Sequence, residues 1–114
     1  MRSNSVQEKS FAFALNIIQL YKKLAEQLEY VISQQLLRAG TSIGANIEEA
    51  QAAQSRKDFL SKMAIAAKEA RETRYWLRLL EESQLVSIDV SAELAAVNEL
   101  VRMLTAIVKT TATS

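Results

Sequence analysis

The residue types that carry most hydrolytic and metal chemistry are missing from this sequence. It contains neither histidine nor cysteine, which removes cysteine nucleophiles, histidine general bases and zinc sites built on those ligands. The adjacent Glu48 and Glu49 suggest the carboxylate pairs of di-iron bundles, but those sites also need Glu-x-x-His motifs. Thr41 and Ser42 belong to no phosphate-binding loop of the G-x-x-x-x-G-K-[ST] type. The sequence therefore predicts no enzyme, no bound metal and no cofactor.

A row of basic residues suggests a different chemistry, the binding of phosphate groups. Residues 56–78 include seven Lys or Arg and only three Asp or Glu. The predicted phosphate contacts, on one side of a helix, are Lys68, Arg71, Arg74 and Arg78, with Arg38 and Lys57 as weaker candidates. One interpretation is a nucleic-acid surface. The other is a solvated face whose charges are neutralised by Glu81, Glu82 or Glu93 of the same or a neighbouring subunit.

These side chains need helices to position them, and most of the sequence has a helical pattern. Proline is absent, glycine occurs twice, and apolar residues recur at intervals of three and four. The spacing predicts four helices, over about residues 6–28, 32–54, 56–82 and 89–109, with residues 110–114 frayed. Short connections make consecutive helices antiparallel neighbours. We therefore expect an all-α, up-down-up-down antiparallel four-helix bundle that forms a single domain over residues 1–114.

The predicted first helix has more apolar surface than one bundle core can cover. One apolar stripe includes Phe13, Ile17 and Leu20, and a second stripe beside it includes Phe11 and Ile18. Together the stripes span roughly 220° of the helix, whereas about 100° is enough for a helix on a monomer surface. This excess predicts that the chain associates with further copies of itself.

Four more residues are singled out by their positions beside the predicted core. Gly40 and Gly44 lie one turn apart in the second helix, where each costs about 0.8–1 kcal/mol relative to alanine. A close backbone approach is expected there, either inside the bundle or between subunits. Asn46 borders the core stripe, where its amide is expected to hydrogen-bond a neighbouring helix. Trp76 lies off the main core face, where it either covers the bundle edge or anchors an interface.

The total charge and the hydropathy of the sequence indicate neither a strongly basic nucleic-acid binder nor a membrane protein. The formal net charge is +1, far from the strong basicity of a dedicated nucleic-acid binder. No apolar signal-peptide core precedes the first helix, and no window approaches 18 uninterrupted apolar residues. We therefore expect a cytoplasmic protein with no membrane partner.

A long motif in the second and third predicted helices narrows the interpretation. It consists of three segments, QLLRAGTSIGANIEEA at 35–50, SRKDFL at 55–60 and IAAKEARETRYWL at 65–77. The motif resembles the signature of the bacterial four helix bundle family known from proteins encoded in intervening sequences of 23S ribosomal RNA genes. The resemblance implies a left-handed antiparallel bundle that assembles as a homopentamer and has no enzyme activity. It also implies a nucleic-acid role, because more distant relatives bind a reverse transcriptase and nucleic acid through a basic surface.

The residues and the resemblance together favour a non-enzymatic, oligomeric bundle that serves as a nucleic-acid-associated accessory or scaffold protein. RNA is the first candidate ligand, and DNA the second. The competing hypothesis is a protein-protein adaptor that binds no nucleic acid. Salt dependence distinguishes them, because phosphate binding weakens steeply with salt and a hydrophobic contact does not.

Overall fold

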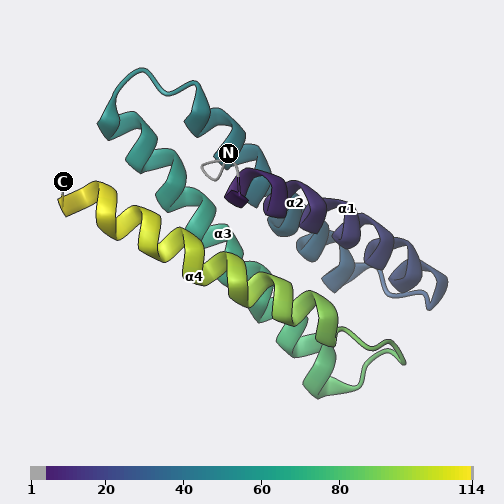
Figure 1. The fold of residues 1–114 in the computed structure, drawn as a ribbon. Coiled ribbons are helices and arrows are strands. Elements are labelled where there is room, and N and C mark those ends of the chain that lie inside the picture. Colours follow the sequence, from purple (N-terminus) through teal and green to yellow (C-terminus); the bar gives the residue numbers. More distant parts are fainter. Residues whose placement is uncertain (1–4, 114) are drawn as a thin grey trace.

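Figure 1 shows the computed structural model of the chain, which describes residues 5–113 as a bundle of four helices. No strand occurs in this described part of the chain. Consecutive helices pack against one another, and the first also packs against the last. The bounds are α1 (Ser5–Glu26), α2 (Val31–Gln51), α3 (Arg56–Ser83) and α4 (Ser91–Thr113). The predicted all-α four-helix bundle is confirmed, whereas its up-down-up-down topology and its handedness stay predictions.

The turn between α1 and α2 ends the first helix earlier than its apolar pattern predicts. Leu28 adopts a left-handed conformation with φ of 63°, which is incompatible with a continuing right-handed helix. The carboxylate of Glu29 then accepts hydrogen bonds from the first three backbone N–H groups of α2, at 3.0, 2.9 and 2.7 Å. Because these N–H groups have no partner within the helix, Glu29 defines where α2 begins.

Side-chain caps also set the ends of the later helices. The hydroxyl of Ser55 accepts a hydrogen bond from the backbone N–H of Asp58 at 3.0 Å. The Asp58 carboxylate in turn accepts one from the backbone N–H of Gln54 at 3.2 Å. This cap occupies the residues just before α3, so α2 stops short of the predicted residue 54. Similarly, α4 begins at Ser91 rather than at Asp89, because the Asp89 carboxylate accepts the backbone N–H of Ser91 at 2.9 Å.

The predicted fraying of residues 110–114 is wrong for residues 110–113, which continue α4. Two contacts support this last turn. The Thr113 hydroxyl donates to the backbone carbonyl of Lys109 at 3.0 Å, and the guanidinium of Arg56 donates to the carbonyl of Thr111 at 2.9 Å. Ser114 lies outside the described residues.

The core is built from the apolar faces that the helical spacing predicts. Its largest fully buried side chains are Phe13, Ile17, Leu20, Leu24, Leu36, Ile43, Ile47, Met63, Leu77, Val90, Leu100 and Leu104. The second apolar stripe of α1 stays outside this core. Phe11, Leu15 and Ile18 remain 63%, 50% and 40% exposed. The surplus apolar surface expected on the first helix is therefore present in the single chain.

Candidate nucleic-acid interface

Four predicted phosphate contacts lie along the flank of α3 that adjoins α4. Lys68, Arg71 and Arg78 are exposed and Arg74 is half-buried. The guanidinium of Arg71 donates to the Thr105 hydroxyl of α4 at 3.2 Å. One turn further along, the guanidinium of Arg74 donates to the side-chain oxygen of Asn98, also of α4, at 3.3 Å. These two contacts orient the arginines across the seam between the helices.

The charges on this flank are largely uncompensated. The acceptors of Arg71 and Arg74 are a hydroxyl and an amide, which are neutral. Neither arginine, nor Lys68, makes an ion pair within the described residues 5–113. Because an arginine has five N–H donors, one hydrogen bond to a neutral group leaves most of its donors available for a phosphate.

Neutralisation by nearby acids, the alternative interpretation, occurs at one end of this flank. Arg78 pairs with Glu82 at 3.4 Å, one turn along α3, with both side chains 64% exposed. Exposed pairs of this kind contribute about 0.3–0.5 kcal/mol. Glu81 is exposed and makes no ion pair within residues 5–113. The Oε1 atom of Glu93 is buried without a hydrogen-bond partner in that same range, so neither acid compensates the flank inside one chain.

Two cations of α4 extend the flank, and sequence reasoning missed both. Asn98, Arg102, Thr105 and Lys109 follow one another at intervals of four, three and four, which places them on one side of the helix. Thr105 and Asn98 contact the arginines of α3. Arg102 and Lys109 therefore lie on the side of α4 that adjoins this flank of α3. Both are exposed. The α3/α4 basic face thus comprises Lys68, Arg71, Arg74, Arg78, Arg102 and Lys109.

The two weaker candidates lie in different places. Lys57 is exposed and precedes Lys68 by eleven residues, about three helical turns, so it lies on the same side of α3. Arg38 instead lies on α2, where its guanidinium pairs with Glu69 at 3.4 Å and with Glu72. Both acids belong to the side of α3 that faces α2. The structure therefore separates Arg38 from the basic face and compensates its charge.

A second set of polar contacts lies at the edge of the bundle where α2 meets α3. The indole N–H of Trp76 donates to the Glu72 carboxylate at 3.0 Å, and its ring meets Tyr75 edge-on with centroids 5.3 Å apart. Trp76 is half-buried and covers this edge of the bundle. Lys62 and Glu49 pair at 3.0 Å, and this carboxylate raises the pKa of Lys62. Glu49 therefore acts as a salt-bridge partner.

Asn46 bonds within its own helix. Its side-chain amide donates to the Ser42 carbonyl at 2.9 Å and to the Ser42 hydroxyl at 3.1 Å. The hydrogen bond to a neighbouring helix that the wheel position predicts is not formed within residues 5–113. The reason is that a neighbouring turn of α2 already offers two acceptors within reach of the short Asn side chain.

Gly40 and Gly44 face α1 of the same chain. A Cβ atom added to Gly40 would lie 3.0 Å from Cγ2 of Ile17, and one added to Gly44 would lie 3.5 Å from the carbonyl oxygen of Ser10. Both glycines therefore line a close approach of α1 and α2 inside the bundle.

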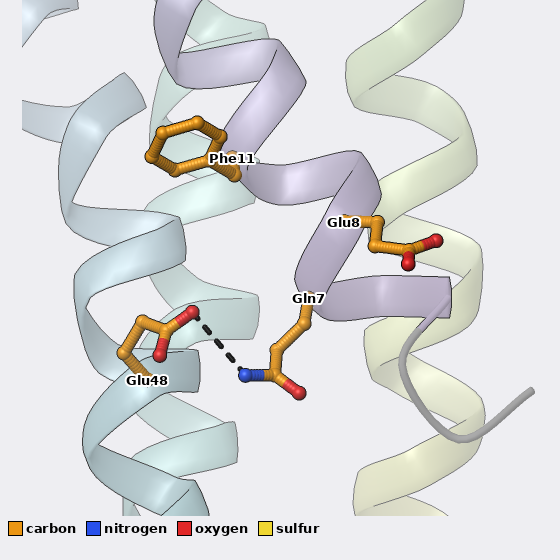
Figure 2. A pocket seen from close by; sticks show the side chains of 4 residues that line it. All are labelled: Gln7, Glu8, Phe11 and Glu48. Atoms are coloured by element: carbon orange, nitrogen blue, oxygen red, sulfur yellow. Dashed lines mark hydrogen bonds between the residues drawn. The ribbon is translucent and has the colours of Figure 1, made fainter. Parts of the chain in front are cut away.

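A shallow hollow of about 340 Å³ opens where the first turn of α1 meets α2. Figure 2 shows Gln7 and Glu48 turned toward each other across this seam, and the Gln7 amide donates to the Glu48 carboxylate at 3.2 Å. Glu8 and Phe11 complete the lining. The four residues include no amine, hydroxyl or imidazole that could serve as nucleophile or base partner for these carboxylates. Residues 5–113 also contain no acidic cluster able to hold a metal ion.

The fold and the α3/α4 basic face define an all-α four-helix bundle with one positively charged side. None of the four described helices is long and apolar enough to cross a membrane. The sequence profile of the 23S rRNA-intervening sequence proteins matches residues 2–106. The chain therefore belongs to that family, which confirms the resemblance found in its motifs.

A solved structure supports the same assignment. It is the crystal structure of a protein with unknown function from the S23 ribosomal protein family of Bacteroides thetaiotaomicron VPI-5482. The two chains are 48% identical and superpose with a TM-score of 0.89, over 96% of this chain and 99% of the other. No curated protein matches this chain.

Proposed function

We propose that the protein is a non-enzymatic cytoplasmic accessory or scaffold protein that binds nucleic acid, RNA first, through the α3/α4 basic face. The observation that carries this proposal is the set of unpaired cations on adjacent helices, including Lys68, Arg71, Arg102 and Lys109. Cations gathered along one seam without acidic partners attract a phosphate backbone and release its counterions on binding. The contacts are to phosphates, so little sequence specificity is expected.

Self-association forms the second part of the proposal. Phe11, Leu15 and Ile18 expose an apolar strip on α1, and apolar patches of this kind mark protein interfaces. We propose that copies of the chain assemble through this strip, as five subunits according to the family resemblance. Assembly would repeat the α3/α4 basic face around an axis, and several weak phosphate contacts would then act on one RNA strand.

The test is a fluorescence-anisotropy titration of a structured RNA at about 50 and 200 mM salt. The test variant is Lys68→Glu/Arg71→Glu, and Lys9→Glu/Lys23→Glu is its control because it makes the same change in charge on a side of α1 away from Phe11, Leu15 and Ile18. We expect the α3 variant to weaken binding at least tenfold and to flatten the salt dependence, and the control to bind within about threefold of wild type. Equal losses in both variants would show that only net charge matters.

A wild-type protein that binds no RNA at about 50 mM salt would favour the adaptor hypothesis instead. Light scattering tests the assembly independently. A monomer mass at micromolar concentration would refute self-association, whereas a dimer or tetramer would retain the interface and exclude five subunits.

A further inference from the structure

The two turns at one end of the bundle form a surface that neither RNA binding nor the α1 strip explains. These turns are residues 27–30 between α1 and α2 and residues 84–90 between α3 and α4 (Figure 1). They are joined by Gln27, whose amide accepts the backbone N–H of Ser87 at 2.9 Å and donates to the Ser87 carbonyl at 3.4 Å. We call this end of the bundle the acidic tip, for the charges described below.

Four large apolar side chains are exposed on the acidic tip. Leu28 and Val31 are each 76% exposed, Leu85 is 57% exposed and Tyr30 is 49% exposed. All four line one hollow of about 270 Å³ that lies between the two turns. A hollow of this size accepts one or two apolar side chains of a partner.

Leu28 is unfavourable for folding in two respects. Its φ of 63° lies in the left-handed region, which glycine and asparagine adopt much more readily than leucine. Its side chain also gains little from burial, because three-quarters of it faces water. The left-handed turn itself ends α1, because the backbone N–H groups of Leu28 and Glu29 bond the carbonyls of Ala25 and Leu24 at 3.0 Å. The turn does not need a leucine, so the exposed side chain stays available to a partner.

The two turns and the helix ends next to them carry only negative charge, while Lys23 lies one turn before Glu26 and Arg78 pairs with Glu82. Segments 24–35 and 79–95 contain six acids and no Lys or Arg. The acids are Glu26, Glu29, Glu81, Glu82, Asp89 and Glu93. Four of them are exposed, Glu29 caps α2 and Glu93 is half-buried. Such a rim repels phosphate groups, which disfavours both nucleic acid and an anionic membrane as the occupant.

A second copy of the chain packed head to tail matches the charge but not the apolar hollow. The opposite end of the bundle carries Arg56 and Lys57, both exposed. Yet residues 52–60 and 105–113, which form that end within the described chain, expose no large apolar side chain. Head-to-tail packing would therefore leave Leu28, Val31 and Leu85 uncovered.

We propose that the acidic tip docks a segment of a different protein that presents at least two apolar side chains flanked by Lys or Arg. The apolar side chains fill the hollow between Leu28, Val31 and Leu85. The flanking cations meet Glu26 and Glu81, which are exposed and make no ion pair within residues 5–113. Because the tip is acidic and the α3/α4 face is basic, the two surfaces would recruit different partners, one cationic and one anionic.

The probes are three fluorescein-labelled 14-residue peptides, one alternating Lys with Leu, one Lys with Ser and one Glu with Leu. The tip variant is Leu28→Asn/Leu85→Ser, in which asparagine suits the left-handed position and keeps the turn. The matched control is Ile65→Ser/Tyr75→Asn, which removes two exposed apolar side chains from α3. Circular dichroism at 222 nm verifies that both variants fold.

We expect the wild type to bind the Lys-Leu peptide at least tenfold more tightly than either other peptide. The tip variant should lose at least tenfold in affinity for it, and the α3 control should stay within about twofold. Glu26→Gln/Glu81→Gln should weaken binding about threefold or more and reduce its salt dependence. Equal binding of the Lys-Ser peptide, or unchanged affinity in the tip variant, would overturn the proposal. A tip variant that loses oligomer mass in light scattering would also overturn it, because the occupant would then be a second copy.

Discussion

The contact between α1 and α2 predicts opposite effects on stability when either of two glycines, one turn apart on α2, is replaced by alanine. Replacing glycine by alanine inside a helix stabilises it by about 0.8–1 kcal/mol when the methyl group has room. At Gly44 the new Cβ would lie 3.5 Å from both the carbonyl and the hydroxyl oxygen of Ser10, an ordinary contact distance. At Gly40 it would lie 3.0 and 3.1 Å from Cγ2 and Cγ1 of Ile17.

Ile17 has no room to yield, because it is fully buried and β-branched, which restricts its χ1 rotamer in a helix. Overpacking of this kind costs about 1–3 kcal/mol, which exceeds the propensity gain. We therefore expect Gly44→Ala to stabilise the protein by about 0.5–1 kcal/mol and Gly40→Ala to destabilise it by about 0–2 kcal/mol. Both substitutions gain the same helix propensity, so this gain cancels when the two changes in the free energy of unfolding are subtracted. The remaining difference, about 1–3 kcal/mol, measures the clash with Ile17.

The measurement is urea unfolding followed by circular dichroism at 222 nm, at one fixed chain concentration because association shifts apparent stability. Ile17→Ala provides the internal control, since it removes both Cγ atoms that the new methyl group would meet. In that background Gly40→Ala should become stabilising, because the methyl group enters the vacated space. If Gly40→Ala is as stabilising as Gly44→Ala in the wild-type background, the close approach inferred at Ile17 is wrong.

Three further predictions concern the caps and the basic face. Glu29→Ala should destabilise the protein by about 1–2 kcal/mol in urea unfolding, because three N–H groups of α2 lose their acceptor; no change would show that water replaces the carboxylate. The backbone N–H of Ser91 holds the pKa of Asp89 below its ordinary value of 3.8. The stability from Asp89 is therefore present above that value and lost as the pH falls through the lower folded pKa. The urea midpoints of wild type and Asp89→Ala should thus converge as the pH falls below 3.8 and through the lower folded pKa, and a constant difference would contradict this. Finally, Arg102→Glu/Lys109→Glu should weaken RNA binding about tenfold or more in the anisotropy assay, and unchanged affinity would remove α4 from the basic face.

The helices and their buried faces could be predicted from the sequence because both depend on local spacing. Phe13, Ile17, Leu20 and Leu24 lie on one side of any helix that contains them, whatever packs against it. The helix ends were less predictable. No glycine or proline marks the end of α1. The N-cap residue of α2 is Tyr30, and the capping carboxylate comes from Glu29 before it, which is not a usual capping residue.

The basic face could be predicted only in part, because charge compensation depends on which helices are neighbours. The residues on α3 followed from their spacing along one helix. Arg102 and Lys109 could have been added to the predicted basic face by placing the last helix beside the basic flank of the third helix. Arg38 was a weaker candidate in the sequence, and its partners Glu69 and Glu72, which compensate its charge, lie 31 and 34 residues away. Such contacts follow from tertiary packing rather than from local pattern.

The nearly neutral total charge conceals a strong segregation of charge along the bundle. The molecule is 46 Å long, whereas salt screens exposed charges over about 8 Å at physiological ionic strength. The acidic tip therefore cannot cancel the field at the far end, where Lys57 and Lys109 lie. Near the tip, by contrast, Arg78 is already paired with Glu82. A bound phosphate backbone should consequently follow the α3/α4 seam from Arg74 toward Lys109, away from the tip, and leave the tip accessible to a protein partner at the same time.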